Sequence, residues 1–319
     1  MPHPLAIVIP AWKSDFLART LECLANQTCK TFRVYVGDDA SPHGIHGVVQ
    51  GFEDRLEITY HRFESNLGGA DLVSHWERCL ELTNGEPLLW LFSDDDLLSS
   101  TCVEHLLTMW TDLPEVDLFH FDIDVVGEQD EILYTPAEFP PRLTGSDFYR
   151  LRRDNRILSF APEFVFTRRI HQRYGFVRFD LAWGADLCTW IQYAGEHGIA
   201  TVPAGRVSWR RSRVNISPNH GDVALLLRKI SSEIDQMAWV RAQFRSSGVA
   251  WTFRDEVRTA HAFCRNSIQH VPLARATVWW RMLRAAARTS ESPLAPLLYF
   301  GLACASAIRR RLLPVGTPR

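Results

Sequence analysis

The fold of this chain is decided by residues 87–96, which read Pro-Leu-Leu-Trp-Leu-Phe-Ser-Asp-Asp-Asp. The apolar run predicts a buried strand that delivers three adjacent carboxylates to its carboxyl end. Neighbouring negative charges repel one another, so this arrangement needs a cation beside it. Carboxylate oxygens are the ligands that hard divalent ions prefer. Residues 94–96 therefore predict a metal site at the end of a strand.

A structural role for these aspartates is the alternative interpretation. An aspartate can cap the helix that follows it, and apolar residues recur at helical spacing a few positions later. These residues are Val103, Leu106, Leu107 and Trp110. The residues of this segment alone leave both interpretations open.

Two earlier segments end in the same way. Residues 5–9 form an apolar run that passes into Pro10-Ala11-Trp12-Lys13, and residues 32–37 pass into Asp38-Asp39-Ala40-Ser41. Helical patterns separate the three apolar runs, which predicts an α/β protein with parallel strands. The carboxyl ends of such strands lie at one edge of the sheet, where α/β proteins bind ligands.

Five short segments also carry a family resemblance. They are Ile7–Pro10, Leu21–Thr28, Val36–Ser41, Asn66–Ala70 and Phe92–Asp96. Their order and spacing resemble those of the family-two glycosyltransferases, which have a nucleotide-sugar fold of the GT-A type. The resemblance implies an α/β fold with a mixed, mainly parallel sheet flanked by helices.

The resemblance also implies an organisation for the chain. Residues 1–112 would form the nucleotide-sugar-binding half, and residues 113–217 the acceptor-binding half of the same catalytic domain. Beyond residue 217 the resemblance fades, and apolar residues recur at helical spacing over 223–244 and 251–268. Residues 218–319 are therefore expected to form a C-terminal helical extension.

Near the start of the chain, Ser14-Asp15 is expected to cap a helix through Leu17, Leu21 and Leu24.

Most of the donor site follows from the resemblance. Asp95 matches the metal-binding position, with Asp96 and Asp94 helping directly or through water, and the ion would be Mn or Mg. Asp39 matches the acid that accepts the imide N–H of uracil or thymine. The other nucleotide-binding candidates are Pro10, Trp12, Asp38, Asn66, Gly68 and Arg78. Trp12 in the core and Arg78 solvated on its helix are the alternatives.

The acceptor side is expected to carry the catalytic base. Asp186 matches the second member of an acidic pair at a helix start, and Ala185 replaces the first. Asp180 is the alternative base, and a helix-capping role for Asp186 is the structural alternative. Further on, Arg210, Arg211 and Arg213 resemble the segment that closes over the diphosphate, because guanidinium groups match phosphate oxygens. A solvated basic turn would give the same pattern.

Composition limits the classes of partner. The 319 residues carry a formal net charge of -2, which gives no overall attraction to nucleic acid. Seven cysteines without a paired motif or a secretory leader indicate reduced thiols in the cytoplasm.

The C-terminal tail differs in composition from the rest of the chain, with Trp279-Trp280 and arginine clusters flanking an apolar run too short to span a bilayer. Residues 272–314 predict either a peripheral contact with the inner membrane or a helical hairpin packed on the catalytic domain.

The expected function is metal-dependent, inverting sugar transfer. The donor would be a nucleoside-diphosphate sugar with UDP or dTDP, and the acceptor a saccharide, such as a lipid-linked intermediate of a bacterial surface polysaccharide. The enzyme would work in the cytoplasm or at the cytoplasmic face of the membrane. A non-catalytic subunit of a glycan assembly complex is the alternative, and the presence of Asp39, Asp95 and Asp186 favours the enzyme. A nucleotidyltransferase would need a Gly-rich basic loop for a triphosphate, which the first loop lacks.

Overall fold

A computed structural model describes residues 3–212, 222–271 and 275–312. The chain divides into two compact units. The sheet unit comprises Met1–Arg152, Arg156–Arg178 and Ala185–Asn215, and the helical unit comprises Arg153–Asn155, Phe179–Gly184 and Ile216–Arg319. Each unit has a hydrophobic cluster of its own.

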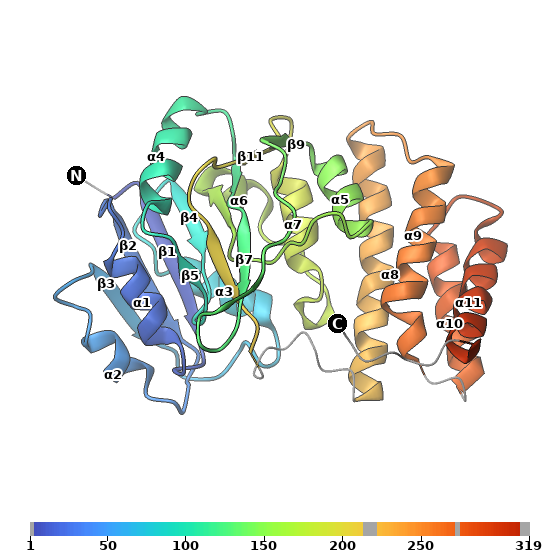
Figure 1. Ribbon diagram of the computed structural model, residues 1–319, viewed down its shortest axis with the longest axis horizontal. Helices are drawn as coiled ribbons and strands as arrows, with labels where there is room; N and C mark the ends of the chain where they lie inside the picture. Colours follow the sequence, from blue (N-terminus) through green and yellow to red (C-terminus); the bar gives the residue numbers. More distant parts are fainter. Residues whose placement is uncertain (1–2, 213–221, 272–274, 313–319) are drawn as a thin grey trace. The chain divides into compact units, whose positions relative to one another are not determined.

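An eight-stranded sheet forms the centre of the sheet unit (Figure 1). Four neighbouring strands, in the order β3-β2-β1-β4, run parallel, and the other four complete a mixed sheet. The bounds in spatial order are β3 (Ile58–Arg62), β2 (Phe32–Asp38), β1 (Leu5–Ala11), β4 (Leu88–Leu91), β10 (Phe164–Thr167), β6 (Leu118–His120), β11 (Ile199–Thr201) and β9 (Arg142–Leu143). The predicted mixed, mainly parallel sheet is confirmed.

Helices and a smaller sheet complete this unit. The helices are α1 (Leu17–Ala25), α2 (Ile45–Gln50), α3 (Leu72–Leu80), α4 (Cys102–Asp112), α5 (Gly145–Arg153), α6 (Arg168–Tyr174) and α7 (Ala185–Tyr193). The smaller sheet has the order β5-β12-β7-β8, with β5 (Leu97–Leu98), β12 (Val207–Arg210), β7 (Ile123–Val126) and β8 (Ile132–Tyr134). Strand β12 thus lies beside β5, which begins one residue after the three carboxylates.

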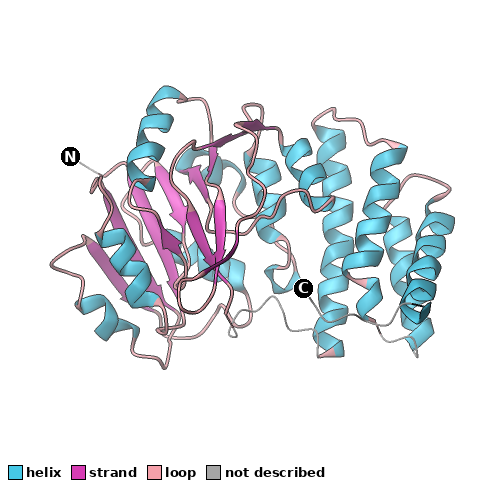
Figure 2. Ribbon diagram, viewed as in Figure 1, coloured by secondary structure: helices cyan, strands magenta, loops and turns pink. Residues whose placement is uncertain are grey.

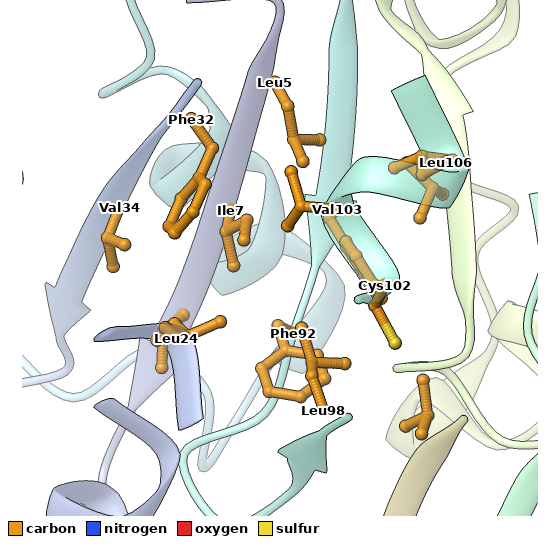
Figure 3. Packing of buried hydrophobic residues seen from close by; sticks show 14 of the residues in the cluster. Leu5, Ile7, Leu24, Phe32, Val34, Phe92, Leu98, Cys102, Val103 and Leu106 are labelled. Carbon is orange, nitrogen blue, oxygen red and sulfur yellow. The ribbon is translucent and has the colours of Figure 1, made fainter. Parts of the chain in front are cut away.

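The core explains why β1 is central. Its residues are buried on both faces, as expected for a strand covered by helices on each side of a parallel sheet. Side chains of β1, β2, α1 and α4 meet in one cluster, in which Ile7, Phe32, Leu24 and Val103 are almost fully buried (Figure 3).

The predicted cap of the first helix is wrong. Helix α1 begins at Leu17, and its N-cap is Phe16, which makes no side-chain cap bond. Asp94 positions the segment before this helix, because its carboxylate accepts the backbone N–H groups of Trp12 and Lys13. A contact with a residue 81 positions away thus sets the path into the helix.

The helical unit confirms the predicted C-terminal extension (Figure 2). It contains α8 (Val223–Ser246), α9 (Phe253–Asn266), α10 (Ala276–Arg288) and α11 (Ala295–Leu312), with short 3-10 turns η1 (Asp180–Ala182) and η2 (Ile268–His270). The hairpin α10–α11 packs on α8 and α9 around Ile230, Phe263 and Tyr299. Among the described residues, no helix is both long enough and apolar enough to cross a membrane.

Truncation of the central core should cost far more than the same truncation at the surface. Leu24→Ala leaves a cavity beside β1 and should lower the free energy of unfolding by about 2–5 kcal/mol. Leu133→Ala is the matched control, since Leu133 is 46% exposed. It should change the value by less than about 1 kcal/mol. Urea titration measures both, and equal losses would contradict this description of the core.

Candidate functional site

The carboxyl ends of three strands meet at one edge of the large sheet. Strand β1 pairs in parallel with β2 on one side and β4 on the other. The backbone N–H of Asp39 donates to Ala11 O at 3.0 Å, and that of Phe92 to Val8 O at 2.8 Å. The acidic residues that follow β2 and β4 therefore lie on either side of the segment that follows β1, as the sequence predicts.

The three carboxylates after β4 are nearly excluded from water, with exposed fractions of 5%, 6% and 1% for Asp94, Asp95 and Asp96. Asp94 Oδ2 accepts the backbone N–H groups of Trp12 at 2.8 Å and Lys13 at 2.7 Å. The Lys13 ammonium donates to Asp95 Oδ2 and lies 3.6 Å from Asp94 Oδ1. Lys13, which the sequence interpretation left without a role, thus supplies the positive charge nearest to the run.

The surroundings of this cluster oppose ionisation of two of its carboxylates. Burial, together with the negative charge of Asp95, raises the pKa of Asp96 to about 8. Burial also raises the pKa of Asp94, against the positive charge of Lys13. Although burial acts in the opposite direction, Asp94 and Asp95 together raise the pKa of Lys13. Asp94 and Asp96 therefore resist ionisation even beside the Lys13 ammonium, and a further cation would favour their ionised forms.

A hard cation fits the donors that this cluster offers. Asp96 Oδ1 accepts the backbone N–H of Arg210 at 2.7 Å, whereas the buried Asp96 Oδ2 has no hydrogen-bond partner among the described residues. Within that part of the chain, no three His, Cys, Asp or Glu side chains converge on one metal position. Asp95 and Asp96 suit a Mg or Mn ion that takes its remaining ligands from water and phosphate.

Asp38, the last residue of β2, is hydrogen-bonded by neighbouring residues. It is fully buried, and its carboxylate accepts bonds from Ser41 N at 2.7 Å, Tyr60 Oη at 2.6 Å and an Arg62 guanidinium nitrogen at 2.8 Å. These bonds order the loop after β2 against β3. The structure thus gives Asp38 a clear part in shaping the loop.

Asp39 organises the turn at 66–69. Its Oδ1 accepts Leu67 N at 2.8 Å and the Arg78 guanidinium, and its Oδ2 accepts Gly68 N at 2.9 Å. A Cβ atom on Gly68 would lie 2.8 Å from Asp39 Oδ2, so the close approach requires glycine. Asn66 closes the same turn through its side-chain oxygen, which accepts Gly69 N at 2.9 Å. The structure therefore brings Asp39, Asn66, Gly68 and Arg78 together.

Pro10 and Trp12 lie at the end of β1. Pro10 is the partner of Gly37 across the parallel pair. The Trp12 side chain is 38% exposed, so it is not a core residue, and its ring meets the edge of His43 at a centroid distance of 6.0 Å. Its carbonyl accepts a bond from Ser41 Oγ. Trp12 thus presents an aromatic surface beside the acidic loops.

The two described arginines of the candidate phosphate-closing segment differ sharply. Arg210 is fully buried, with Nε donating to Asp95 O at 2.7 Å and Nη1 to Gly127 O at 2.7 Å, and it forms an ion pair with Asp130 at 2.6 Å. It supports the backbone of the carboxylate run. Arg211 is exposed. Arg213 lies outside the described residues.

Asp186 lies in the first turn of α7 and is half-buried. Burial raises its pKa, against the nearby positive charge of Arg152. Burial also raises the pKa of Glu163 well above its ordinary value, and Asp186 adds to this effect. Sequence reasoning missed Arg152 and Glu163, because neither belongs to a recognisable motif.

The alternative base, Asp180, belongs to the helical unit and accepts two hydrogen bonds from Arg228, of 2.8 Å and 2.6 Å.

Comparison with known proteins adds three sets of findings. A sequence model described as "Glycosyl transferase family 2" matches residues 6–175. The chain is 45% identical over 67 residues to a validoxylamine A glucosyltransferase of Streptomyces hygroscopicus subsp. limoneus, and 34% identical over 106 residues to a chondroitin synthase of Escherichia coli. These matches cover 20% and 30% of this chain, and 15% and 16% of the two relatives.

Similar solved structures extend the likeness to most of the chain. A structure of S. aureus TarS residues 1–349 with UDP-GlcNAc aligns with a TM-score of 0.69 at 16% identity, over 96% of this chain and 88% of that one. The mannosyltransferase PcManGT from Pyrobaculum calidifontis, with GDP-Man and Mn2+, aligns with a TM-score of 0.50 at 17% identity, over 95% and 80%. At these identities the likeness concerns the fold, and it confirms the predicted GT-A type.

Arg210 and Arg211 provide a test of how the carboxylate run is supported. Arg210→Met leaves the buried carbonyls of Asp95 and Gly127 without their donor and should lower the free energy of unfolding by about 2 kcal/mol or more. The neighbouring Arg211→Met removes an exposed side chain and should change it by less than about 0.5 kcal/mol. Chemical denaturation compares the two variants. A similar, small loss in both would show that Arg210 does not support the carboxylate run.

Proposed function

The chain belongs to glycosyl transferase family 2, and on that premise we propose that it transfers a sugar from a nucleoside diphosphate to a saccharide acceptor. One observation carries the proposal. The buried carboxylates of Asp95 and Asp96 follow β4 and Asp39 follows β2, so they lie at the edge where β1, β2 and β4 end, and α/β proteins bind ligands at such an edge. The divalent cation that accompanies a sugar nucleotide would bring positive charge to these carboxylates.

We propose that the donor carries uracil or thymine. Asp39 Oδ1 already accepts two donors, but Oδ2 accepts one among the described residues and so retains a free lone pair. An imide N–H can occupy that position, with Trp12 and Pro10 flanking the base and Asp38 near the ribose. Asn66, Gly68 and Arg78 would then line the nucleotide through the turn that Asp39 holds. A UDP-GlcNAc complex of a protein with the same fold agrees with such a donor.

For the diphosphate, we propose that Asp95 and Asp96 hold Mn or Mg, with Asp94 in support. When bound, the ion would neutralise the charge that develops on the leaving phosphate oxygen. Arg211 remains the described candidate for a direct phosphate contact, whereas Arg210 would act by fixing the backbone of Asp95 and Asp96.

Asp186 is the proposed base. Burial raises the pKa of this carboxylate, which makes it a stronger base than an exposed aspartate. It would take the proton of the acceptor hydroxyl as the oxygen attacks the anomeric carbon and the bond to the diphosphate breaks. A single displacement of this kind inverts the anomeric centre.

We propose that the acceptor is a saccharide, carried on lipid as an intermediate of a bacterial surface polysaccharide. The protein would then work in the cytoplasm, at the inner face of the membrane, with residues 272–314 in peripheral contact. The domain division at residues 112 and 217 is likewise proposed.

A panel of UDP, dTDP and GDP sugars with Mn tests the activity, through release of the nucleoside diphosphate. Release from none of them, together with retained binding, would favour the non-catalytic subunit.

Loss of the Asp95 carboxylate should abolish metal-dependent nucleotide binding. Asp95→Ala removes the proposed ligand from a strand end outside the hydrophobic cluster, so the fold should persist. Calorimetry with UDP and Mn should give an affinity that no longer depends on the metal. Asp112→Ala, at an exposed carboxylate on α4, is the control and should bind as the wild type does. Metal-independent UDP binding in the wild type itself would contradict the assignment.

Replacement of the base should separate catalysis from binding. Asp186→Asn keeps the shape of the side chain but removes its basicity, so kcat should fall by roughly a hundredfold to ten-thousandfold. The affinity for the donor should stay close to that of the wild type. Asp180→Asn serves as the comparison and should retain turnover. If the effects are reversed between the two variants, Asp180 is the base.

A further inference from the structure

The hairpin α10–α11 presents large apolar side chains to solvent. Ten large apolar residues are exposed among those that the structure describes, and four of them lie on this hairpin. They are Trp280, Leu294, Leu297 and Phe300, with exposed fractions of 52%, 54%, 73% and 48%. Such a concentration marks a contact surface, since scattered apolar residues are the norm elsewhere on proteins.

Two of these side chains are in direct contact. The rings of Trp280 and Phe300 meet edge to face at a centroid distance of 5.7 Å, across the two helices. Leu297 lies one helical turn before Phe300 on α11, and Leu294 is in the turn that leads into this helix. The two rings also line an open pocket of about 170 Å³, together with Ala276, Trp279, Leu283, Ala303 and Cys304. We call the four exposed residues the apolar face.

A row of positive charge borders the apolar face. Arg281, Arg284 and Arg288 are exposed on α10, and Arg284 lies one helical turn beyond Trp280. Neither α10 nor α11 contains an aspartate or glutamate. Glu291, in the loop between them, forms an ion pair with Arg245 of α8. The charge beside the apolar face is therefore uniformly positive on the two helices that carry it.

Charge complementarity selects the occupant of this surface. A second copy of the chain, docked about a two-fold axis, would bring the positively charged margins of two apolar faces together. An anionic bilayer offers a hydrocarbon boundary for the aromatic and leucine side chains and phosphates for the arginines. The described helices do not span a membrane, so the contact would be interfacial.

We propose that the apolar face, with Arg281, Arg284 and Arg288, docks the protein on a bilayer that contains anionic lipid. Trp280, Leu297 and Phe300 insert at the boundary between headgroups and acyl chains, and the arginines bind lipid phosphates. This inference deepens the proposed function and rests on it for its purpose, which is access to a lipid-linked acceptor. The docking itself needs no sugar transfer.

Sedimentation of the full chain with vesicles tests the docking without an activity assay. Vesicles of phosphatidylcholine with a quarter phosphatidylglycerol should bind the protein at low salt, and pure phosphatidylcholine vesicles should bind it far more weakly. Raising the salt should weaken the binding, because counterions screen the arginines. Failure of donor turnover with retained vesicle binding would count against the proposed activity alone, and the reverse result would overturn the docking alone.

Two sets of substitutions separate the apolar and the charged parts. Arg281→Gln, Arg284→Gln and Arg288→Gln together should weaken binding by about a hundredfold, since each arginine near an anionic surface contributes about fivefold. Leu297→Gln with Phe300→Gln should also release the protein. Ile132→Gln with Leu133→Gln, at exposed positions of β8, is the control and should bind fully. Circular dichroism checks that each variant is folded.

Three results would overturn the docking. The first is no binding of the wild type to anionic vesicles at low salt. The second is equal binding by all the variants. The third is a dimer, detected by light scattering, that Leu297→Gln with Phe300→Gln dissociates, which would assign the apolar face to contact between copies of the chain.

Discussion

Three carboxylates that lie almost out of water at the end of β4 impose the main constraint on the sheet unit. Each takes a different compensation: two backbone N–H groups for Asp94, the Lys13 ammonium for Asp95 and the Arg210 N–H for Asp96. These donors come from the segment after β1 and from β12, so the site exists only when distant parts of the chain are assembled. The raised pKa of Asp96 shows that the compensation is incomplete. A cation bound beside Asp96 would lower this pKa by favouring the ionised carboxylate.

The constraint extends from the carboxylates to the neighbouring loops. Parallel pairing of β1 with β2 and β4 brings the segment after β2 to the same edge, where Asp39 ties down the turn at 66–69. Loops held by such hydrogen bonds would lose little entropy on binding a ligand. The buried guanidinium of Arg210 donates to the carbonyl of Asp95 and so stabilises the backbone of the carboxylate run. Its effect on a ligand would be indirect.

The sequence was informative where local pattern and chemistry coincide. The apolar runs predicted β1, β2 and β4 and the shared edge at which they end, and the short segments in order predicted the GT-A fold. Buried arrangements that depend on distant contacts were not predictable. The contact of Lys13 with Asp95 spans 82 residues, and nothing in the local pattern shows that Arg210 points inward while Arg211 points to solvent. The cap of α1 was wrong for the same reason, because Asp94 holds the backbone before it.

The central claim is that the edge beside β1 binds a nucleoside diphosphate through a cation on Asp95 and Asp96. Crystals grown with UDP and Mn, measured at the manganese absorption edge, test it directly. The account predicts an anomalous peak about 2.1 Å from a carboxylate oxygen of Asp95 or Asp96 and from a diphosphate oxygen. A well-ordered diphosphate with no peak there, or a nucleotide bound elsewhere on the protein, would contradict it.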